Sequence, residues 1–211
     1  MEIIKLIQIV LVLFCIVGIP GLVYETDVYD EVYSGIVSVK CLSCLKLDPA
    51  TKIEYVFDTQ TGEEHPGFIR ENLTEGIVFL HFSEDACKGC DIMLPIVQDL
   101  FNVSFGKKET FYKRLEFKNH TLNYFYVNID HSKEKWNSIF KMYDKDDIGG
   151  LPMFSIVSVR YNKGIVKPYY TSLYSTLNRD TNEKREDFLN KIVNESFELY
   201  DKNIQGYQPD Y

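Results

Sequence analysis

The chain has 211 residues, a formal net charge of −8 and a sequence pI of about 5.1. This acidic balance argues against a nucleic-acid partner, because no basic patch is present that would neutralise phosphate groups. A hydrophobic fraction of 45%, with 15 Tyr and 14 Phe, is typical of a well-packed globular protein rather than a disordered chain.

The first clear pattern is an almost wholly apolar stretch at residues 6–23. Its length, about 18 residues, is near the lower limit for a helix that spans a bilayer. Lys5 precedes it and acidic residues follow, so the positive-inside rule predicts a cytoplasmic N-terminus and an exported remainder. A cleavable signal peptide is the alternative, but no small-x-small cleavage site is present. We expect residues 1–24 to be a transmembrane signal-anchor in the cell membrane, in contact with the lipid bilayer, with the rest of the chain extracytoplasmic.

Residues 25–70 are expected to form a short β-rich extension, with strands near 36–39 and 52–57. Cys41 and Cys44 form a CxxC pair within it. Three interpretations of this pair stay open: a structural disulfide, a redox pair that exchanges electrons with a second dithiol, and half of a four-cysteine zinc site.

From residue 71 to residue 200 the sequence alternates strand and helix patterns, and residues 201–211 are predicted to be a flexible tail. The order strand, helix, strand, helix, strand, strand, helix is typical of an α/β domain. Strands are predicted at 77–82, 124–130, 153–159 and 165–170, and helices at 90–101, 132–143 and 182–200.

A second CxxC lies between the first strand and the first helix of this domain. Because Cys87 is placed at the N-terminal end of a helix, free N–H groups and the positive end of the helix dipole stabilise its thiolate. Cys90, about one helical turn later, can close back onto Cys87. Lys88 favours the thiolate, whereas Glu84, Asp85 and Asp91 oppose it. The pattern indicates a redox-active dithiol.

Residues 71–200 resemble a thioredoxin domain in several independent features. A buried strand precedes the CxxC, Pro95 stands five residues after the second cysteine, Val-Asn-Ile-Asp occupies 127–130, and Gly-Leu-Pro at 150–152 precedes the next strand. These features occur in the order found in the thioredoxin family. The resemblance implies a thioredoxin-like fold, with a central mixed sheet and flanking helices.

The resemblance also implies a thiol–disulfide oxidoreductase that needs no cofactor or metal. Cys87 would form the mixed disulfide and Cys90 would resolve it. Pro152 would follow a cis peptide bond and lie against the dithiol. The partners would be exported protein thiols or disulfides, together with a membrane electron donor or acceptor. The residues expected to contact the substrate are Leu151, Lys88 and Gly89.

The sequence departs from the family at three places. Ala86 replaces the tryptophan that commonly precedes the first cysteine, Lys-Gly replaces the Gly-Pro between the cysteines, and His81 stands where the family has a buried aspartate. The imidazole of His81 could accept the proton of the resolving thiol. Alternatively, it is a core histidine satisfied by hydrogen bonds. A non-catalytic binding module, with its cysteines in a structural disulfide or a zinc site, is the alternative function.

Overall fold

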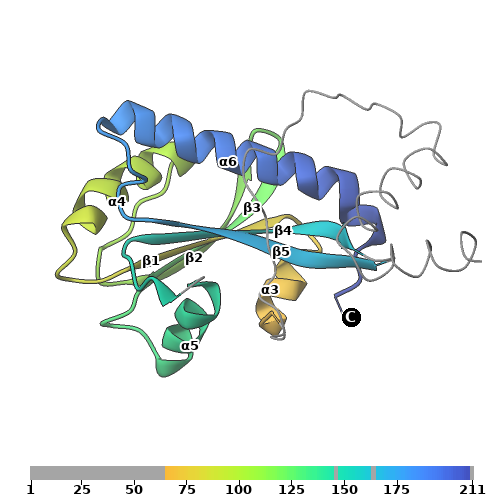
Figure 1. The fold of residues 1–211 in the computed structure, drawn as a ribbon, viewed down its shortest axis with the longest axis horizontal. Helices are drawn as coiled ribbons and strands as arrows, with labels where there is room; N and C mark the ends of the chain where they lie inside the picture. Colours follow the sequence, from red (N-terminus) through yellow and green to blue (C-terminus); the bar gives the residue numbers. More distant parts are fainter. Residues whose placement is uncertain (1–64, 145–146, 163–164, 210–211) are drawn as a thin grey trace, which may run out of the picture. The chain divides into compact units, whose positions relative to one another are not determined.

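The computed structural model describes residues 65–144, 147–162 and 165–209, nearly all of which belong to one compact unit (Figure 1). No helix within these residues is long and apolar enough to cross a membrane. The predicted membrane anchor, the strands near 36–39 and 52–57, and the Cys41–Cys44 pair lie outside the described residues.

A mixed five-stranded sheet in the order β2-β3-β1-β4-β5 forms the centre of this unit. The central strand β1 pairs in parallel with β3 and antiparallel with β4, while β2 pairs antiparallel with β3. The α/β class with a mixed sheet and flanking helices is therefore confirmed. The strands are β1 Ile77–Ser83, β2 Thr110–Phe117, β3 His120–Asn128, β4 Met153–Asn162 and β5 Ile165–Tyr174.

Helices cover both faces of the sheet, with α4 and α6 on one face and α3 and α5 on the other (Figure 1). All seven residues of β1 are buried, as expected for a central strand covered on both faces. Along this strand Phe79 contacts Phe101 of α4, and Phe82 contacts Phe140 of α5. The helices are α3 Gly67–Asn72, α4 Lys88–Phe101, α5 Glu134–Tyr143 and α6 Asn182–Asn203.

Two elements of the structure were not predicted from the sequence. Strand β2 lies at the edge of the sheet, and most of its side chains are exposed, so it lacks the apolar alternation of a half-buried strand. It joins β3 through a two-residue turn at Lys118 and Asn119, both in the left-handed region with φ of 51° and 66°. Helix α3 has six residues, too few to show a helical period.

The C-terminal segment differs from the predicted flexible tail. Helix α6 continues to Asn203, and a 3₁₀ turn follows at Ile204–Gly206. Tyr207 then bridges to Val166 of β5, and its hydroxyl donates a hydrogen bond to the Arg70 carbonyl at 3.1 Å. The ring of Tyr207 is apolar and its hydroxyl needs a hydrogen-bond partner, and packing against the domain provides for both.

The domain also begins earlier than residue 71. The ring of His65 lies 2.8 Å, by its Nδ1 atom, from the hydroxyl of Tyr143 in α5. Phe68 of α3 packs edge-on against Phe125 and Trp136. The packed unit therefore includes at least residues 65–209, apart from the two short gaps.

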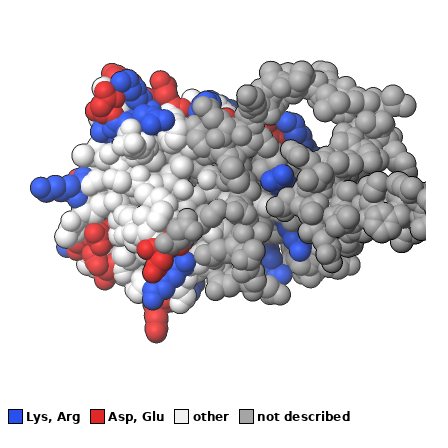
Figure 2. All heavy atoms as spheres, in the orientation of Figure 1, with Lys and Arg blue, Asp and Glu red and all other residues white. Residues whose placement is uncertain are grey.

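The charged side chains of the described residues are mixed in sign on the face drawn in Figure 2. Acidic and basic groups stand side by side around a largely uncharged area. The part of this face that the described residues form shows no continuous basic surface of the kind that binds nucleic-acid phosphates (Figure 2).

Candidate active site

Cys87 and Cys90 form a disulfide at the N-terminus of α4. Cys87 is the N-cap residue of the helix, and its Sγ accepts a hydrogen bond from the Cys90 N–H at 2.9 Å. Helix α4 begins at Lys88, two residues before the predicted start, so both cysteines belong to its first turn. A thiolate at Cys87 would lie where unpaired helix N–H groups favour negative charge.

The two cysteine residues differ slightly in their exposure to solvent. The exposed fraction of Cys87 is 7%, whereas Cys90 is completely buried. Cys87 is therefore the more accessible residue of the pair, although both are buried. The exposure difference supports the predicted order of events, in which Cys87 attacks a partner and Cys90 attacks only Cys87.

The structure brings the loop before β4 against the CxxC turn. The Leu151–Pro152 peptide bond is cis, as predicted. A Cβ atom added to Gly89 would lie 3.0 Å from Cδ of Pro152 and 3.4 Å from the Leu151 carbonyl oxygen. Pro152 is buried, Leu151 is half-buried and Lys88 is exposed. Apart from His81, the predicted site residues in the described part of the chain therefore lie around one dithiol.

A further backbone hydrogen bond holds this loop. The N–H of Ser175, at the end of β5, donates to the Pro152 carbonyl at 2.8 Å. Ser175, Leu177 and Asn178 all adopt positive φ between 55° and 59°. Left-handed backbone at three non-glycine residues in one short loop costs free energy and often accompanies functional sites. The sequence had no signal for this loop, because none of the three residues is glycine.

His81 lies in the middle of β1, on the sheet face that α4 covers. It is completely buried, and its ring packs against Tyr126 and Phe154 with centroid distances of 4.9 Å and 4.6 Å. Its Nδ1 atom is 3.0 Å from the Tyr124 hydroxyl, while Nε2 has no hydrogen-bond partner among the described residues. Burial lowers the pKa of His81 to about 3, so the ring is neutral near pH 7. One nitrogen is therefore satisfied as in a core histidine, and the low pKa disfavours a proton on the other.

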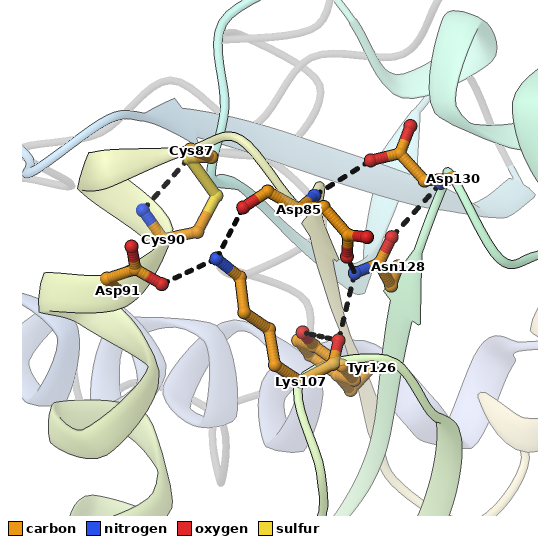
Figure 3. Close-up of a disulfide and its surroundings, with 8 residues drawn as sticks. All are labelled: Asp85, Cys87, Cys90, Asp91, Lys107, Tyr126, Asn128 and Asp130. Atoms are coloured by element: carbon orange, nitrogen blue, oxygen red, sulfur yellow. Dashed lines mark hydrogen bonds and ion pairs between the residues drawn. A yellow bond between two sulfur atoms is a disulfide. The ribbon is translucent and has the colours of Figure 1, made fainter.

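Lys107, which the sequence analysis missed, lies beside the disulfide (Figure 3). Its ammonium group donates to the Asp85 carbonyl at 2.8 Å and to Oδ1 of Asp91 at 2.5 Å. Asp85 and Asp91 stand on either side of the CxxC, and Lys107 is distant in sequence from both. No sequence spacing therefore connects the three residues. Only the fold brings the loop before β2 to this place.

The side chain of Asp85 belongs to the same group of contacts. Its carboxylate accepts hydrogen bonds from Nδ2 of Asn128 at 2.9 Å and from Nε2 of His131 at 2.8 Å, and Lys108 lies 3.6 Å away. The hydrogen bond from His131 is the main cause that lowers the pKa of Asp85. The backbone N–H of Asp85 donates to Asp130 at 2.8 Å. The segment that leads into Cys87 is thus held by the end of β3.

Within residues 65–144, 147–162 and 165–209, no group of three or more His, Cys, Asp or Glu side chains could hold a metal ion. Cys41 and Cys44 are not among these residues, so a zinc site that joins the two cysteine pairs stays a hypothesis.

No protein-family model matches this sequence, and no curated protein is significantly similar to it. The functional assignment therefore depends on the chemistry of the site itself.

Proposed function

We propose that this protein is a thiol–disulfide oxidoreductase with a thioredoxin-like fold. The observation that carries the proposal is the placement of the Cys87–Cys90 disulfide at the N-terminus of α4, with Gly89 directly against the cis proline Pro152. A disulfide that served only to join two segments would not need a helix N-terminus at one sulfur.

In the reducing direction the thiolate of Cys87 attacks one sulfur of a substrate disulfide. A mixed disulfide forms, and the other substrate sulfur leaves as a thiolate. Cys90 then loses its proton and attacks Sγ of Cys87, which re-forms the Cys87–Cys90 bond and releases the second substrate thiolate. Two electrons pass from the dithiol to the substrate, and the two substrate thiolates take up the protons. The same steps in reverse oxidise a substrate dithiol.

The residues around the dithiol would orient the substrate. Leu151 offers backbone groups next to Pro152, and Lys88 and Gly89 form the turn over which a substrate segment would lie. Proton transfer from Cys90 to His81 stays a prediction: Nε2 of His81 has no hydrogen-bond partner among the described residues, but burial lowers the pKa of the ring to about 3, which disfavours the protonated form.

We further propose that residues 6–23 anchor the protein in the membrane and that the domain acts outside the cytoplasm on exported proteins. A dithiol in that location needs a membrane partner that supplies or removes electrons. Cys41 and Cys44 would be a structural disulfide or an intermediate carrier in this transfer.

The test is turnover of a protein disulfide by the full-length chain, with dithiothreitol as the electron source. Cys87→Ser is expected to abolish turnover, and Cys90→Ser to accumulate a mixed disulfide with the substrate. The matched control is Cys41→Ser/Cys44→Ser, which removes the other CxxC and should retain the exchange at Cys87. Undiminished turnover by Cys87→Ser would contradict the proposal. No turnover by the parent, with zinc bound after anaerobic purification, would favour the binding module.

A further inference from the structure

We propose that Lys107 is a positioning residue of the dithiol: its ammonium group holds both ends of the CxxC segment and offsets the charge of Asp91, which favours the reduced state. This inference deepens the proposed function and rests on it.

The ammonium group of Lys107 joins two places that flank the disulfide in sequence. Asp85, whose carbonyl accepts at 2.8 Å, stands two residues before Cys87. Asp91, whose carboxylate accepts at 2.5 Å, directly follows Cys90. Figure 3 shows the lysine nitrogen between these two acceptors, next to the turn that carries the disulfide. One cation therefore fixes the entry and the exit of the CxxC turn.

The backbone of Lys107 is itself fixed by the sheet. Its carbonyl accepts hydrogen bonds from the Tyr126 hydroxyl at 2.6 Å and from Nδ2 of Asn128 at 3.0 Å, both in β3. In the same loop, the Phe105 carbonyl accepts from Nε2 of Gln98 in α4 at 2.8 Å. A lysine in a free surface loop loses side-chain entropy when it forms an ion pair. Here the anchored backbone places the base of the side chain beside the dithiol, so no backbone freedom is lost when the ion pair forms.

The charge of Lys107 matters most when the dithiol is reduced. The disulfide carries no charge, whereas reduction can place a negative charge on Cys87 close to the carboxylate of Asp91. Without the lysine, the two negative charges would repel each other and the thiolate would be less favourable. The side chain of Lys107 is 25% exposed and that of Asp91 is 61% exposed, so solvent screens the lysine in part and the carboxylate more strongly.

Most other charges near this segment have partners of their own or face solvent, while Glu84 is half-buried. The Asp85 carboxylate is held by Asn128 and His131, with Lys108 nearby, as described above. Lys88 is exposed. The remaining charged residues of the segment and of the loops packed on it are Glu84, Glu109 and Asp130.

The test uses opposite charge changes at the two ends of one ion pair. In a full-length chain with Cys15, Cys41 and Cys44 changed to serine, the variants are Lys107→Met, Asp91→Asn, the double variant and Lys107→Arg. Two quantities are measured for each: the rate of Cys87 alkylation by iodoacetamide across pH, and the equilibrium constant for reduction by glutathione. Lys108→Met, at the adjacent and more exposed lysine, is the matched control.

We expect Lys107→Met to slow alkylation at pH 7 and to disfavour the reduced dithiol, each by about three- to tenfold, with the alkylation midpoint moved to higher pH. Tenfold corresponds to a reduction potential about 30 mV lower. Asp91→Asn should act in the opposite direction, the double variant should return towards the parent, and Lys107→Arg should retain the parent values. Lys108→Met should change either quantity less than about twofold.

A lysine that only stabilised the fold would give another pattern. Equal changes in the same direction for Lys107→Met and Asp91→Asn, or no change for either, would overturn the inference while leaving the oxidoreductase proposal intact. If Lys107→Met fails to fold, the Asp91→Asn variant still tests the inference. Faster alkylation and a more favourable reduction in that variant would support it, and the opposite changes would overturn it. A parent dithiol that never equilibrates with glutathione would overturn both proposals.

Discussion

Gly89 allows the turn that carries the dithiol to lie close to Pro152. Its missing side chain leaves room for Cδ of Pro152, which a Cβ atom would approach to 3.0 Å. Contacts of this length force a neighbour to move by a few tenths of an ångström. The proline ring is rigid and buried, so the turn that carries Cys87 and Cys90 is the part expected to move.

We therefore expect Gly89→Ala to lower kcat/KM for a protein disulfide about tenfold, since small displacements at a reacting centre are costly. The free energy of unfolding should fall by only about 1 kcal/mol, because the contact is tight rather than overlapping. Steady-state kinetics and urea denaturation measure the two effects. A variant with full activity and the parent stability would show that Pro152 does not depend on the glycine.

His81 makes the stability of the domain depend on pH. Its pKa is lowered to about 3 by burial, from 6.5 for the exposed group. Above pH 6.5 the ring is neutral in both folded and unfolded chains, so stability is unaffected. Below pH 6.5 the unfolded chain binds a proton that the folded chain does not, and stability falls until the folded ring also protonates.

Between pH 7.5 and pH 5, the His81 contribution to the free energy of unfolding should fall by about 2 kcal/mol. Urea denaturation at the two pH values measures the change. His81→Leu should be less stable at pH 7.5, because the Tyr124 hydroxyl loses its partner, but should show a smaller fall towards pH 5. His65, whose pKa burial lowers to about 4, keeps part of the pH dependence in the variant. An unchanged fall in His81→Leu would contradict this assignment.

Elements with a strong apolar period are the ones that the sequence predicts well. Strand β1 is a continuous buried run, and α4 and α6 each place apolar residues at helical spacing, so their existence follows from pattern alone. The edge strand β2 escaped prediction because solvent, rather than a core, faces most of its side chains. Strand β3 begins at His120, four residues before the predicted start, since its first residues pair with β2.

For the candidate site, too, the sequence predicts the local features and not the long-range ones. The cysteines and Pro152 belong to local motifs and were found, whereas Lys107 depends on a loop brought to the site from a distance. The left-handed loop at Ser175–Asn178 was missed for a related reason, since its shape is imposed by packing rather than by glycine. Local chemistry is encoded in short motifs, but long-range contacts require the fold.

The start of β1 offers an element-scale test of the parallel pairing with β3. A Cβ atom on Gly76 would overlap the backbone oxygen of Thr121. Because backbone in a paired strand cannot give way, Gly76→Ala should lower the free energy of unfolding by about 3 kcal/mol or more. The matched control is Gly67→Ala in α3, where nothing lies within 4 Å and the change should stay within about 0.5 kcal/mol. Equal stabilities of the two variants in urea denaturation would argue against the described β1–β3 register.

At the scale of the whole molecule, the sheet serves as the rigid support on which the dithiol, Pro152 and Lys107 converge. Strand β1 leads into the CxxC turn, β4 begins directly after Pro152, and β3 holds the loop of Lys107. Since β1 lies between β3 and β4 in the sheet, the three components of the site come from neighbouring strands. The proposed chemistry needs this arrangement, because the thiolate, the substrate segment and the balancing charge must meet at the same end of the sheet.

The reduction potential of the Cys87–Cys90 pair is the most direct test of this account. The full-length chain with Cys41→Ser/Cys44→Ser is equilibrated in glutathione and dithiothreitol buffers, and the oxidised fraction is measured by thiol trapping and mass spectrometry. We predict reversible two-electron behaviour with a potential between about −270 and about −120 mV, the range of thioredoxin-fold oxidoreductases. A pair that remains oxidised below about −300 mV would be a structural disulfide, and would contradict the proposed function.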